Sequence, residues 1–351
     1  MAVRVGVLGL NYGARVHVPI YKENTRYDLV AVCARTPGRA EAVAREHHIP
    51  NWYTDVRAFL ASDLDLISIA TPPVTHAHLA AAALVSGKHA VVEVAYVGSA
   101  ADARVLERLA AERHRIGATA YVLRYVPALR FVSDMLSQGA IGEPRLMRMD
   151  FFASFMALPG SEYRWFWEAE NGGGVLAGVV SHGIDLARRW FGPVREVEAS
   201  LLTLSTPPRL PPRITAADDT GLVTLHFESG MVASFNFSAA TAYRRVAIEL
   251  HGSQASLLID GFGDELSILQ MDEPRPRTLY VPASYLEETR GQNGLLGGLQ
   301  SFIGRLAEPL SGGPLPADLP TFAEGLEVVR LLEAARIASK ERRRVQMEEV
   351  A

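Results

Sequence analysis

The fold is decided by residues 3–14, Val-Arg-Val-Gly-Val-Leu-Gly-Leu-Asn-Tyr-Gly-Ala, where an apolar run ends in a glycine-rich turn. The alternating valines at positions 3, 5 and 7 predict a buried first strand. Gly9 allows a tight turn after that strand, and Ala14 lets the next helix pack closely against it. The N–H groups and the dipole at the start of such a helix favour a pyrophosphate. The stretch therefore predicts the beginning of a dinucleotide-binding βαβ unit.

This turn departs from the dinucleotide fingerprint at one position. The pattern G-x-G-x-x-G/A places Asn11 where the second glycine belongs. Asparagine adopts left-handed backbone more readily than most residues, so the turn can survive, although its side chain is bulkier than glycine against a phosphate. For this motif alone, an ordinary strand-turn-helix is the alternative. The candidate cofactor-binding residues in the turn are Gly9, Asn11, Tyr12, Gly13 and Ala14.

The end of the second strand carries the signal for the type of dinucleotide. Residues 28–33, Asp-Leu-Val-Ala-Val-Cys, form an apolar run that is followed by residues 34–37, Ala-Arg-Thr-Pro. A Rossmann fold reads the adenosine ribose at this point, where a carboxylate favours the free 2′-hydroxyl of NAD. Arg35 can instead pair with a 2′-phosphate, and Thr36 adds a hydroxyl, so the position favours NADP, with NAD possible. The alternative is that Arg35 only caps a surface turn.

Length and composition indicate a globular protein of two domains. The chain has 351 residues, 48% of them hydrophobic and 21% charged, and a formal net charge of −4. This length exceeds that of a usual single core, so we expect a first domain over 1–122 and a second over 123–351. No basic field invites nucleic acid. No apolar stretch approaches the roughly 20 residues that cross a bilayer, and no leader precedes the first strand, so we expect a cytoplasmic protein without a membrane partner.

Strand and helix patterns alternate in the first domain, which predicts a parallel sheet with right-handed crossovers. The single cysteine, Cys33, lies inside one of these strands and is expected to be a packing residue. We expect strands near 3–8, 28–33, 65–70, 89–92 and 117–121, and helices near 13–22, 37–47, 74–86 and 100–114.

The pattern changes after a predicted helix at 127–138. Longer, alternating strands with an antiparallel pattern follow, which is typical of an α+β domain with a large, mostly antiparallel sheet. The tail, 321–343, has helical apolar spacing and is expected to pack back as a long helix, with the first domain as one possible partner. The predicted strands are 144–153, 194–204, 220–228, 231–239, 244–251 and 255–259.

Three further segments carry a resemblance to a known family. They are Ile69-Ala-Thr-Pro-Pro-Val-Thr-His76, Gly87-Lys-His-Ala-Val-Val-Glu-Val-Ala95 and Gly172-Gly-Gly-Val-Leu-Ala-Gly-Val-Val-Ser-His-Gly-Ile-Asp185. Together with the N-terminal turn, they resemble the glucose-fructose oxidoreductase, inositol dehydrogenase and rhizopine-catabolism (Gfo/Idh/MocA) family over nearly the whole chain. The resemblance implies an NAD(P)-dependent oxidoreductase with a Rossmann domain and a second, α+β domain.

The resemblance also implies cofactor contacts at two strand ends. Thr71, Pro72 and His76 resemble family residues that contact the ribose and phosphates, at the sheet edge where ligands bind to open parallel sheets. A structural interpretation, in which Thr71 and Thr75 cap helix N–H groups, is compatible with this. Glu93 ends the next strand at the same edge. Its carboxylate can accept hydrogen bonds from the nicotinamide ribose, whereas an isolated buried carboxylate would be costly.

The chain departs from the family at the position after Glu93. The family tripeptide is Glu-Lys-Pro, whose lysine moves the proton of the substrate hydroxyl, and this chain has Val94 there. Valine cannot transfer a proton. Gly178 likewise stands where many members have an aspartate four residues before the histidine. Lys88 precedes its strand and is expected at the far edge of the sheet, where it cannot replace the family lysine.

His182 is therefore the candidate acid or base. On a helix from about residue 175, Gly178, His182 and Asp185 share one face, and Gly174 and Gly178 are small enough to leave room for a ligand. Histidine exchanges a proton near neutral pH. Taken alone, such a histidine is more often a core residue, but the surrounding motif favours function. The other candidates on the substrate side are Asp185, Arg124, Tyr121 and the run 163–167, whose aromatics alternatively form a hydrophobic patch.

Two functions from different classes follow from these residues. The first is an NADP-preferring oxidoreductase that transfers hydride to or from a sugar-like or small carbonyl or hydroxyl substrate. The second is a nucleotide-binding sensor or assembly subunit without dehydrogenase turnover, or a variant that uses bound cofactor transiently. The absent lysine supports the second, and His182, Asp185 and Glu93 support the first. The sequence predicts no metal site. It predicts a dimer or tetramer that forms through the uncovered face of the second domain's sheet.

Overall fold

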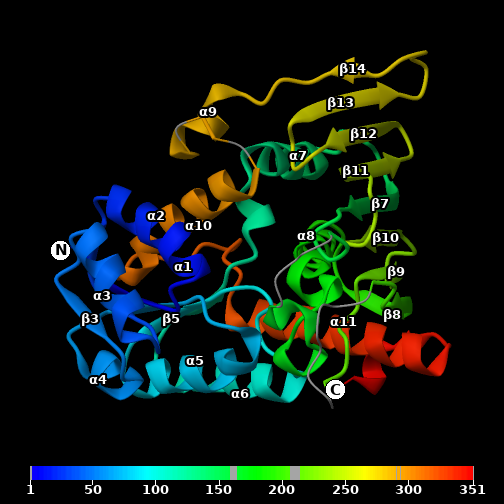
Figure 1. The fold of residues 1–351 in the computed structure, drawn as a ribbon. Coiled ribbons are helices and arrows are strands. Elements are labelled where there is room, and N and C mark those ends of the chain that lie inside the picture. Colours follow the sequence, from blue (N-terminus) through cyan, green and yellow to red (C-terminus); the bar gives the residue numbers. More distant parts are fainter. Residues whose placement is uncertain (1, 159–163, 206–213, 290, 293, 351) are drawn as a thin grey trace. The chain divides into compact units, whose positions relative to one another are not determined.

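The computed structural model describes residues 2–158, 164–205, 214–289, 291–292 and 294–350 (Figure 1). The chain divides into two compact units, one of residues 1–121 and 300–329 and the other of residues 122–299 and 330–351. Residues 300–329 group with the first unit, where Phe322 stacks on Tyr96 at 4.9 Å and lies over Gly117, at which a Cβ atom would come within 2.2 Å of its ring. The division of the sequence into domains of residues 1–122 and 123–351 stays a prediction.

The first unit is built on a six-stranded parallel sheet in the order β3-β2-β1-β4-β5-β6. The strand order reverses direction between β1 and β4, the point at which open α/β sheets bind ligands outside the strand carboxyl ends. All five predicted strands are present. The sixth, β3, was missed because it is a three-residue edge strand without a buried side chain. The bounds are β1 (Val3–Leu8), β2 (Tyr27–Cys33), β3 (Asn51–Tyr53), β4 (Leu66–Ile69), β5 (His89–Val92) and β6 (Gly117–Thr119).

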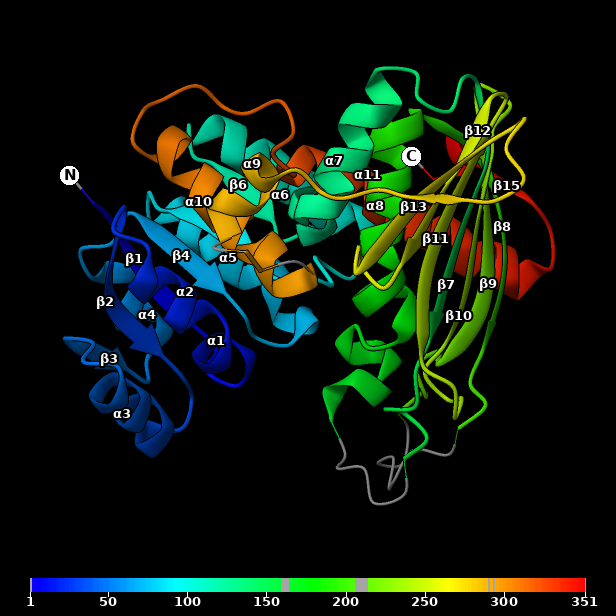
Figure 2. The ribbon, with the colours of Figure 1, turned by 90° about the horizontal axis from the view of Figure 1, so that it is seen from above.

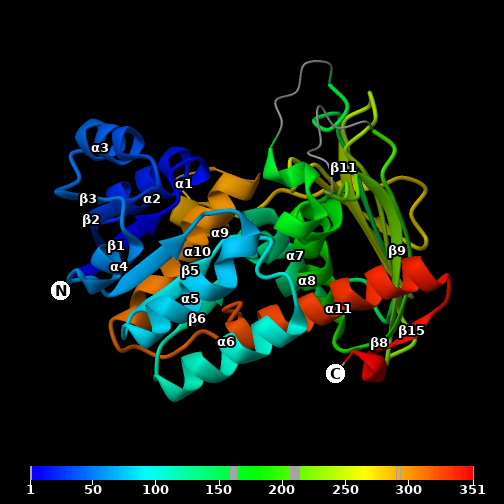
Figure 3. The ribbon, with the colours of Figure 1, turned by 60° about the horizontal axis from the view of Figure 1, so that its bottom comes forward.

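Helices cover both faces of this sheet. Figure 3 shows α4, α5 and α6 on one face and α1, α2 and α3 on the other. Local caps start two of them, since Asp55 accepts the N–H groups of Arg57 and Ala58, and Ser99 accepts that of Asp102. The first predicted helix is divided at Val16. The bounds are α1 (Tyr12–Arg15), α2 (His17–Glu23), α3 (Pro37–Glu46), α4 (Val56–Ala61), α5 (His76–Val85) and α6 (Ala100–Glu112).

The second unit is built on a nine-stranded sheet in the order β14-β13-β12-β11-β7-β10-β9-β8-β15. The sheet is antiparallel except that β7 and β10 pair in parallel, which agrees with the predicted large, mostly antiparallel sheet. All six predicted strands are present, and three more extend the two edges. The bounds are β7 (Pro144–Phe152), β8 (Val194–Leu202), β9 (Thr220–Phe227), β10 (Val232–Ser238), β11 (Arg245–Gly252), β12 (Ala255–Asp260), β13 (Glu265–Gln270), β14 (Arg277–Thr278) and β15 (Val345–Gln346).

Helices α7 (Pro127–Ser137) and α8 (Ser181–Phe191) lie against one face of this sheet (Figure 2). On β9, Val223, Leu225 and Phe227 are buried, and Leu222, which comes just before them and faces the other side of the strand, is exposed, as expected for a sheet covered on one side. Within the described residues, no helix is both long enough and apolar enough to cross a membrane. The remaining helices are α9 (Ala283–Leu286), α10 (Gly294–Leu310) and α11 (Phe322–Glu341). The first two were not predicted, and the last two cross a unit boundary.

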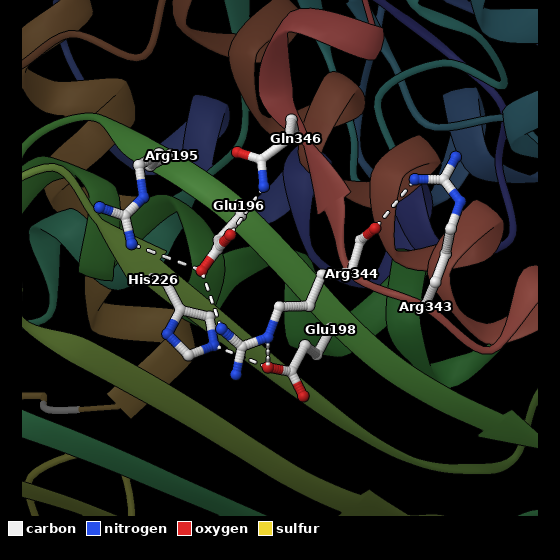
Figure 4. Close-up of polar contacts among 7 residues, drawn as sticks. All are labelled: Arg195, Glu196, Glu198, His226, Arg343, Arg344 and Gln346. Atoms are coloured by element: carbon white, nitrogen blue, oxygen red, sulfur yellow. Dashed lines mark hydrogen bonds and ion pairs between the residues drawn. The ribbon is translucent and has the colours of Figure 1, made fainter.

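The chain returns after α11 to close the β8 edge through a polar cluster, shown in Figure 4. The short strand β15 pairs antiparallel with β8. Glu196 accepts hydrogen bonds from Arg344 at 3.1 Å and from Gln346 at 2.7 Å. Glu198 pairs with both Arg344 and His226, the latter at 3.1 Å. These contacts hold the C-terminal segment on the sheet.

We expect this cluster to make stability depend on pH. The hydrogen bond from Gln346, followed by that from Arg195, holds the pKa of Glu196 below its usual range. A carboxyl group whose pKa is lowered in the folded state contributes its full stability above the unfolded pKa of about 4.3, and this contribution is lost as the pH falls from there through the lower pKa of the folded state. Glu196→Gln is expected to lower the Tm more at pH 7 than at pH 3. A Tm difference that does not change with pH would contradict this.

Candidate functional site

The turn after β1 is shaped by Gly9, which lies at a positive φ of 97°. A Cβ atom there would come within 2.6 Å of the carbonyl oxygen of Ala70, so only glycine fits between the ends of β1 and β4. The Gly9 N–H donates to the carbonyl oxygen of Cys33 at 3.0 Å. Asn11 has φ −83° and ψ −71°, which corrects the expectation of a left-handed residue at this position. Its substitution for glycine therefore costs no backbone strain.

The same turn is held from outside by a residue that the sequence pattern did not indicate. Arg39, on α3, donates from both Nε and Nη2 to the carbonyl oxygen of Leu10, at 3.2 and 3.0 Å. No known dinucleotide-binding motif includes an arginine 29 residues after Leu10, so the sequence alone offers no reason to place Arg39 at the turn. Arg39 thereby links the glycine-rich turn to the segment that follows β2.

Arg35 and Thr36 lie at the carboxyl end of β2, and both are exposed. Among the described residues, no hydrogen bond or ion pair engages the Arg35 side chain, so the alternative role of a turn cap is not found. Thr36 is the N-cap residue of α3, but its hydroxyl does not cap the helix. Both side chains are thus available to a ligand at this strand end.

Thr71, Pro72 and His76 lie after β4. The Thr71 and Thr75 hydroxyls bond to each other at 2.7 Å, and Thr75 donates to the Pro72 carbonyl oxygen, so the expected caps on helix N–H groups are absent. His76 is fully buried, with Nδ1 at 2.9 Å from the Ala95 carbonyl oxygen and Nε2 at 2.7 Å from that of Thr71. Burial lowers the pKa of His76. The ring ties the loops after β4 and β5 together, and its expected contact with the cofactor stays a prediction.

Glu93 follows β5 and is held by a histidine that the sequence reasoning missed. His17, at the start of α2, places Nε2 at 2.7 Å from Glu93 Oε1 and Nδ1 at 2.7 Å from the hydroxyl of Ser68 on β4. The His17 side chain is fully buried, whereas that of Glu93 is 16% exposed. The spacing of eight residues from Gly9 to His17 is the only sequence signal that could have drawn attention to it.

Val94, which stands where the family has a lysine, is half-buried beside Glu93. Within the described part of the chain, no lysine takes the place of the family lysine at this strand end. Lys88 lies before β5, at the opposite edge of the sheet, where its Nζ donates to the Ser62 carbonyl oxygen at 3.1 Å. This is the position that the sequence predicted. Lys22 and Lys340, the other two lysines of the chain, are exposed on α2 and α11.

Arg124 and Asp185 form a buried ion pair in the second unit. Arg124 donates from Nε to Asp185 Oδ2 at 2.7 Å and from Nη2 to Oδ1 at 2.5 Å, and the two side chains are 3% and 0% exposed. Each side chain thus neutralises the charge of the other, and their expected action on substrate stays a prediction. Tyr121 was expected on the substrate side. It is only 1% exposed and lies in the core of the first unit.

His182 is half-buried on α8, one turn before Asp185. The room expected beside it is filled. The ring of Phe166 lies over Gly178, where a Cβ atom would be 2.6 Å from Cε2, and Asp218 fills the space at Gly174. Residues 176–180 form a single wide turn of π-helix that leads into α8, in place of the regular helix predicted from residue 175.

Aromatic side chains gather around Phe166. Phe155 and Trp165 each contact its ring edge-on with centroids 5.6 Å apart, and all three are at least partly exposed. Tyr163 lies outside the described residues. The described part of the expected run therefore forms an aromatic cluster next to the helix of His182.

Comparison with known families matches both units. Residues 3–121 match the oxidoreductase family with an NAD-binding Rossmann fold, and residues 129–258 match the GFO/IDH/MocA C-terminal domain. The chain belongs to the Gfo/Idh/MocA family. The predicted fold class and the prediction of an NAD(P)-dependent oxidoreductase are thereby confirmed.

Individual members of the Gfo/Idh/MocA family are similar over most of the chain. An oxidoreductase of Synechocystis sp. is 28% identical over 264 residues, 73% of this chain and 71% of the relative. The D-apiose dehydrogenase of Paraburkholderia graminis is 26% identical over 285 residues, 79% and 72% of the two chains. The structure of levoglucosan dehydrogenase in complex with NADH and L-sorbose has a TM-score of 0.88 at 22% identity and covers 99% of both chains. At this identity the last likeness shows the fold.

The residues at the strand ends fit the dinucleotide that the Gfo/Idh/MocA family implies. The first turn of α1 carries no acidic side chain, and Asn11 does not cap it, so N–H groups at this turn can receive a phosphate. Glu93 offers a partly exposed carboxylate at the end of β5. Among the described residues, no group of three His, Cys, Asp or Glu side chains is arranged to hold a metal ion.

The contact between Gly178 and Phe166 predicts that Gly178→Ala changes the free energy of unfolding in opposite directions in the presence and in the absence of the Phe166 ring. Gly178→Ala is expected to lower the free energy of unfolding by about 1 kcal/mol, because the new methyl group displaces the ring. In a Phe166→Ala protein the same change is expected to raise it by up to about 1 kcal/mol, through the higher helix propensity of alanine. Denaturant titrations of the four proteins measure this. The same sign in both backgrounds would show that the ring does not oppose a side chain at position 178.

Proposed function

We propose that this enzyme transfers hydride between a nicotinamide dinucleotide, preferably NADP(H), and a sugar-like carbonyl or hydroxyl substrate. The observation that carries the proposal is the glycine-rich turn after β1 together with the anchored carboxylate of Glu93 after β5, both at strand carboxyl ends. D-apiose dehydrogenase is named for a sugar, and levoglucosan dehydrogenase was solved with L-sorbose, which supports a polyhydroxylated substrate.

The chain's own residues have distinct roles in this proposal. The turn after β1 binds phosphate through N–H groups, and Glu93 accepts hydrogen bonds from a ribose. Thr71 and Pro72 shape the loop between them. When bound, the dinucleotide supplies the site that accepts or donates hydride. His182 holds or releases the proton of the substrate hydroxyl, because imidazole exchanges a proton near neutral pH. Arg124 and Asp185 keep the helix of His182 in place.

The preference for NADP rests on Arg35, which is exposed and uncommitted at the end of β2 within the described residues. A charge-assisted hydrogen bond to a 2′-phosphate contributes roughly 1.5–3 kcal/mol, about tenfold to hundredfold in affinity. Arg35→Asp is expected to reverse the preference, since a carboxylate repels the phosphate and accepts from a free ribose diol. Calorimetric titration with NADPH and NADH measures both constants. Equal affinities in the unaltered protein would overturn the assignment.

A second function is favoured by Val94. Without the family lysine, the chain binds the dinucleotide but does not oxidise or reduce a free substrate, and it acts as a sensor or an assembly subunit. The absence of any lysine near the end of β5 among the described residues supports this alternative.

One experiment separates these functions. Purified protein is tested for retained nucleotide, and a panel of sugars and small carbonyl compounds is then screened at the absorbance band of NADPH. Turnover of a panel member supports the oxidoreductase. Retained nucleotide without turnover of any compound supports the alternative, and failure to bind either dinucleotide contradicts both.

We also propose that the protein forms a dimer or tetramer. Helices α7 and α8 lie on one face of the second unit's sheet (Figure 2). Leu146 and Leu222 are exposed and each precedes a buried residue of its strand, so they face the opposite side of the sheet. Light scattering during gel filtration tests this, and a monomer at micromolar concentration would contradict it.

A further inference from the structure

The first unit contains a buried hydrogen-bonded chain that runs from a central strand to the candidate cofactor site. Ser68 on β4, His17 on α2 and Glu93 after β5 are joined by two contacts of 2.7 Å. Ser68 and His17 are fully buried, and the chain reaches solvent only at Glu93. Three secondary-structure elements thus converge on one carboxylate.

The chemistry of the three groups fixes where the protons lie. A carboxylate only accepts hydrogen bonds, so Nε2 of His17 must carry the proton that it shares with Glu93 Oε1. In a neutral ring Nδ1 then has a lone pair, and the Ser68 hydroxyl donates to it. Both ring nitrogens are therefore satisfied without a net charge on the imidazole, and the ring can rotate only by breaking both bonds.

This arrangement leaves the two oxygens of Glu93 unequal. Oε1 is bound to the buried ring, whereas Oε2 has only the weaker contact with the Val94 N–H at 3.2 Å. A ligand at the end of β5 therefore meets Oε2, which keeps lone pairs available. The imidazole sets the direction in which that oxygen points.

His17 is also the only side chain among the described residues that donates a hydrogen bond to Glu93. In the family tripeptide a lysine follows the glutamate, but Val94 brings no charge or donor. The positioning of Glu93 in this chain thus depends on the buried side, and removal of the imidazole would leave a largely buried carboxylate without a side-chain donor.

We propose that His17 is a positioning residue that orients Glu93 toward the nicotinamide half of the dinucleotide, with Ser68 fixing the ring from behind. The proposal rests on the proposed function, because it requires that the dinucleotide binds at the carboxyl ends of these strands. In this proposal His17 affects the binding of the nicotinamide half of the dinucleotide and does not affect the binding of the adenosine half.

The test compares two ligands on the same variants. NADPH contains the nicotinamide half, whereas ADP with a 2′-phosphate lacks both the nicotinamide base and the ribose that carries it. His17→Leu is expected to raise the Kd of NADPH about 10- to 100-fold, the range for hydrogen bonds to charged groups. The Kd of 2′-phospho-ADP is expected to stay within about twofold. Ser68→Ala is expected to raise the Kd of NADPH by a smaller factor in the same direction.

Glu93→Gln provides the matched control, since it removes the charge that His17 orients. The double variant His17→Leu/Glu93→Gln is expected to bind NADPH no more weakly than the worse single variant, because the two changes remove one interaction. His17→Gln keeps an N–H donor and is expected to recover part of the affinity. Thermal melting establishes that each variant is folded, and if His17→Leu fails to fold, Ser68→Ala and His17→Gln carry the comparison.

Three results would overturn the proposal. Equal weakening of NADPH and 2′-phospho-ADP would show that His17 only supports the turn after β1. Multiplicative losses in the double variant would show that His17 and Glu93 act independently. If the unaltered protein binds NADPH and His17→Leu binds it equally well, only this inference fails. If the unaltered protein binds neither ligand, the proposed function itself fails.

Discussion

Asp185→Ala is expected to lower the free energy of unfolding of the second unit by about 3–5 kcal/mol, the largest stability effect that the structure predicts. The change removes the carboxylate that receives two hydrogen bonds from Arg124, at 2.7 and 2.5 Å, in a site where the guanidinium is only 3% exposed. The charge then lies in a low-dielectric environment without its counter-charge. Chemical denaturation followed by circular dichroism measures the loss.

An apolar replacement of the whole pair is the control. Arg124→Met combined with Asp185→Leu removes both charges together, and it is expected to recover most of the stability that Asp185→Ala loses. The comparison separates the cost of an isolated buried charge from the value of the pair. A loss below about 1 kcal/mol for Asp185→Ala would show that water reaches the guanidinium and that the pair behaves as a surface salt bridge.

The sequence predicts the first unit well because its signals are local. The apolar strands and the glycine-rich turn follow from patterns within about ten residues, and Gly9 has the positive φ that the turn requires. Asn11 was interpreted correctly as tolerated but for the wrong reason, since its backbone is right-handed. The edge strand β3 was missed because its residues show neither a buried side chain nor a clear alternation.

The contacts that complete the cofactor site could not be predicted in this way. His17 meets Ser68 and Glu93, which are 51 and 76 residues away, and Arg39 meets Leu10 across 29 residues. No spacing rule within one element links such residues, because the fold alone brings the ends of different strands together. The buried position of His76 is of the same kind, since its partners lie in two loops.

In the second unit, the glycine-rich motif before His182 was recognised, but the reason for its small residues was interpreted wrongly. The glycines before His182 were interpreted as room for a ligand. Instead, the Gly174 N–H donates to the Phe166 carbonyl oxygen at 3.0 Å, and a Cβ atom at Gly173 would come within 2.4 Å of that oxygen. The small residues permit close approach of the segment that carries Phe166. A small residue in a sequence indicates that something comes near, but not whether it is a ligand or the chain itself.

The proton-transfer residue can be identified by replacing His182. His182→Asn is expected to lower the rate of the chemical step by about 10²–10⁴-fold, the usual contribution of general acid or base catalysis, and to leave the affinity for NADPH nearly unchanged. The side chain is half-buried on α8, and no lysine stands at position 94 to take its place. The pH–rate profile is expected to lose its limb near neutrality, because imidazole is the group that titrates there.

His251→Asn is the matched control for this prediction, since His251 is a half-buried histidine of the same unit whose Nδ1 contacts the Ser256 hydroxyl on the neighbouring strand. It is expected to retain the turnover and the pH profile of the unaltered protein. A structural role for His182 would give another pattern, in which His182→Asn lowers the Tm while the folded protein keeps its turnover and its neutral limb. That result would assign the proton to Tyr163 or to water, because Tyr121 is buried in the core of the first unit.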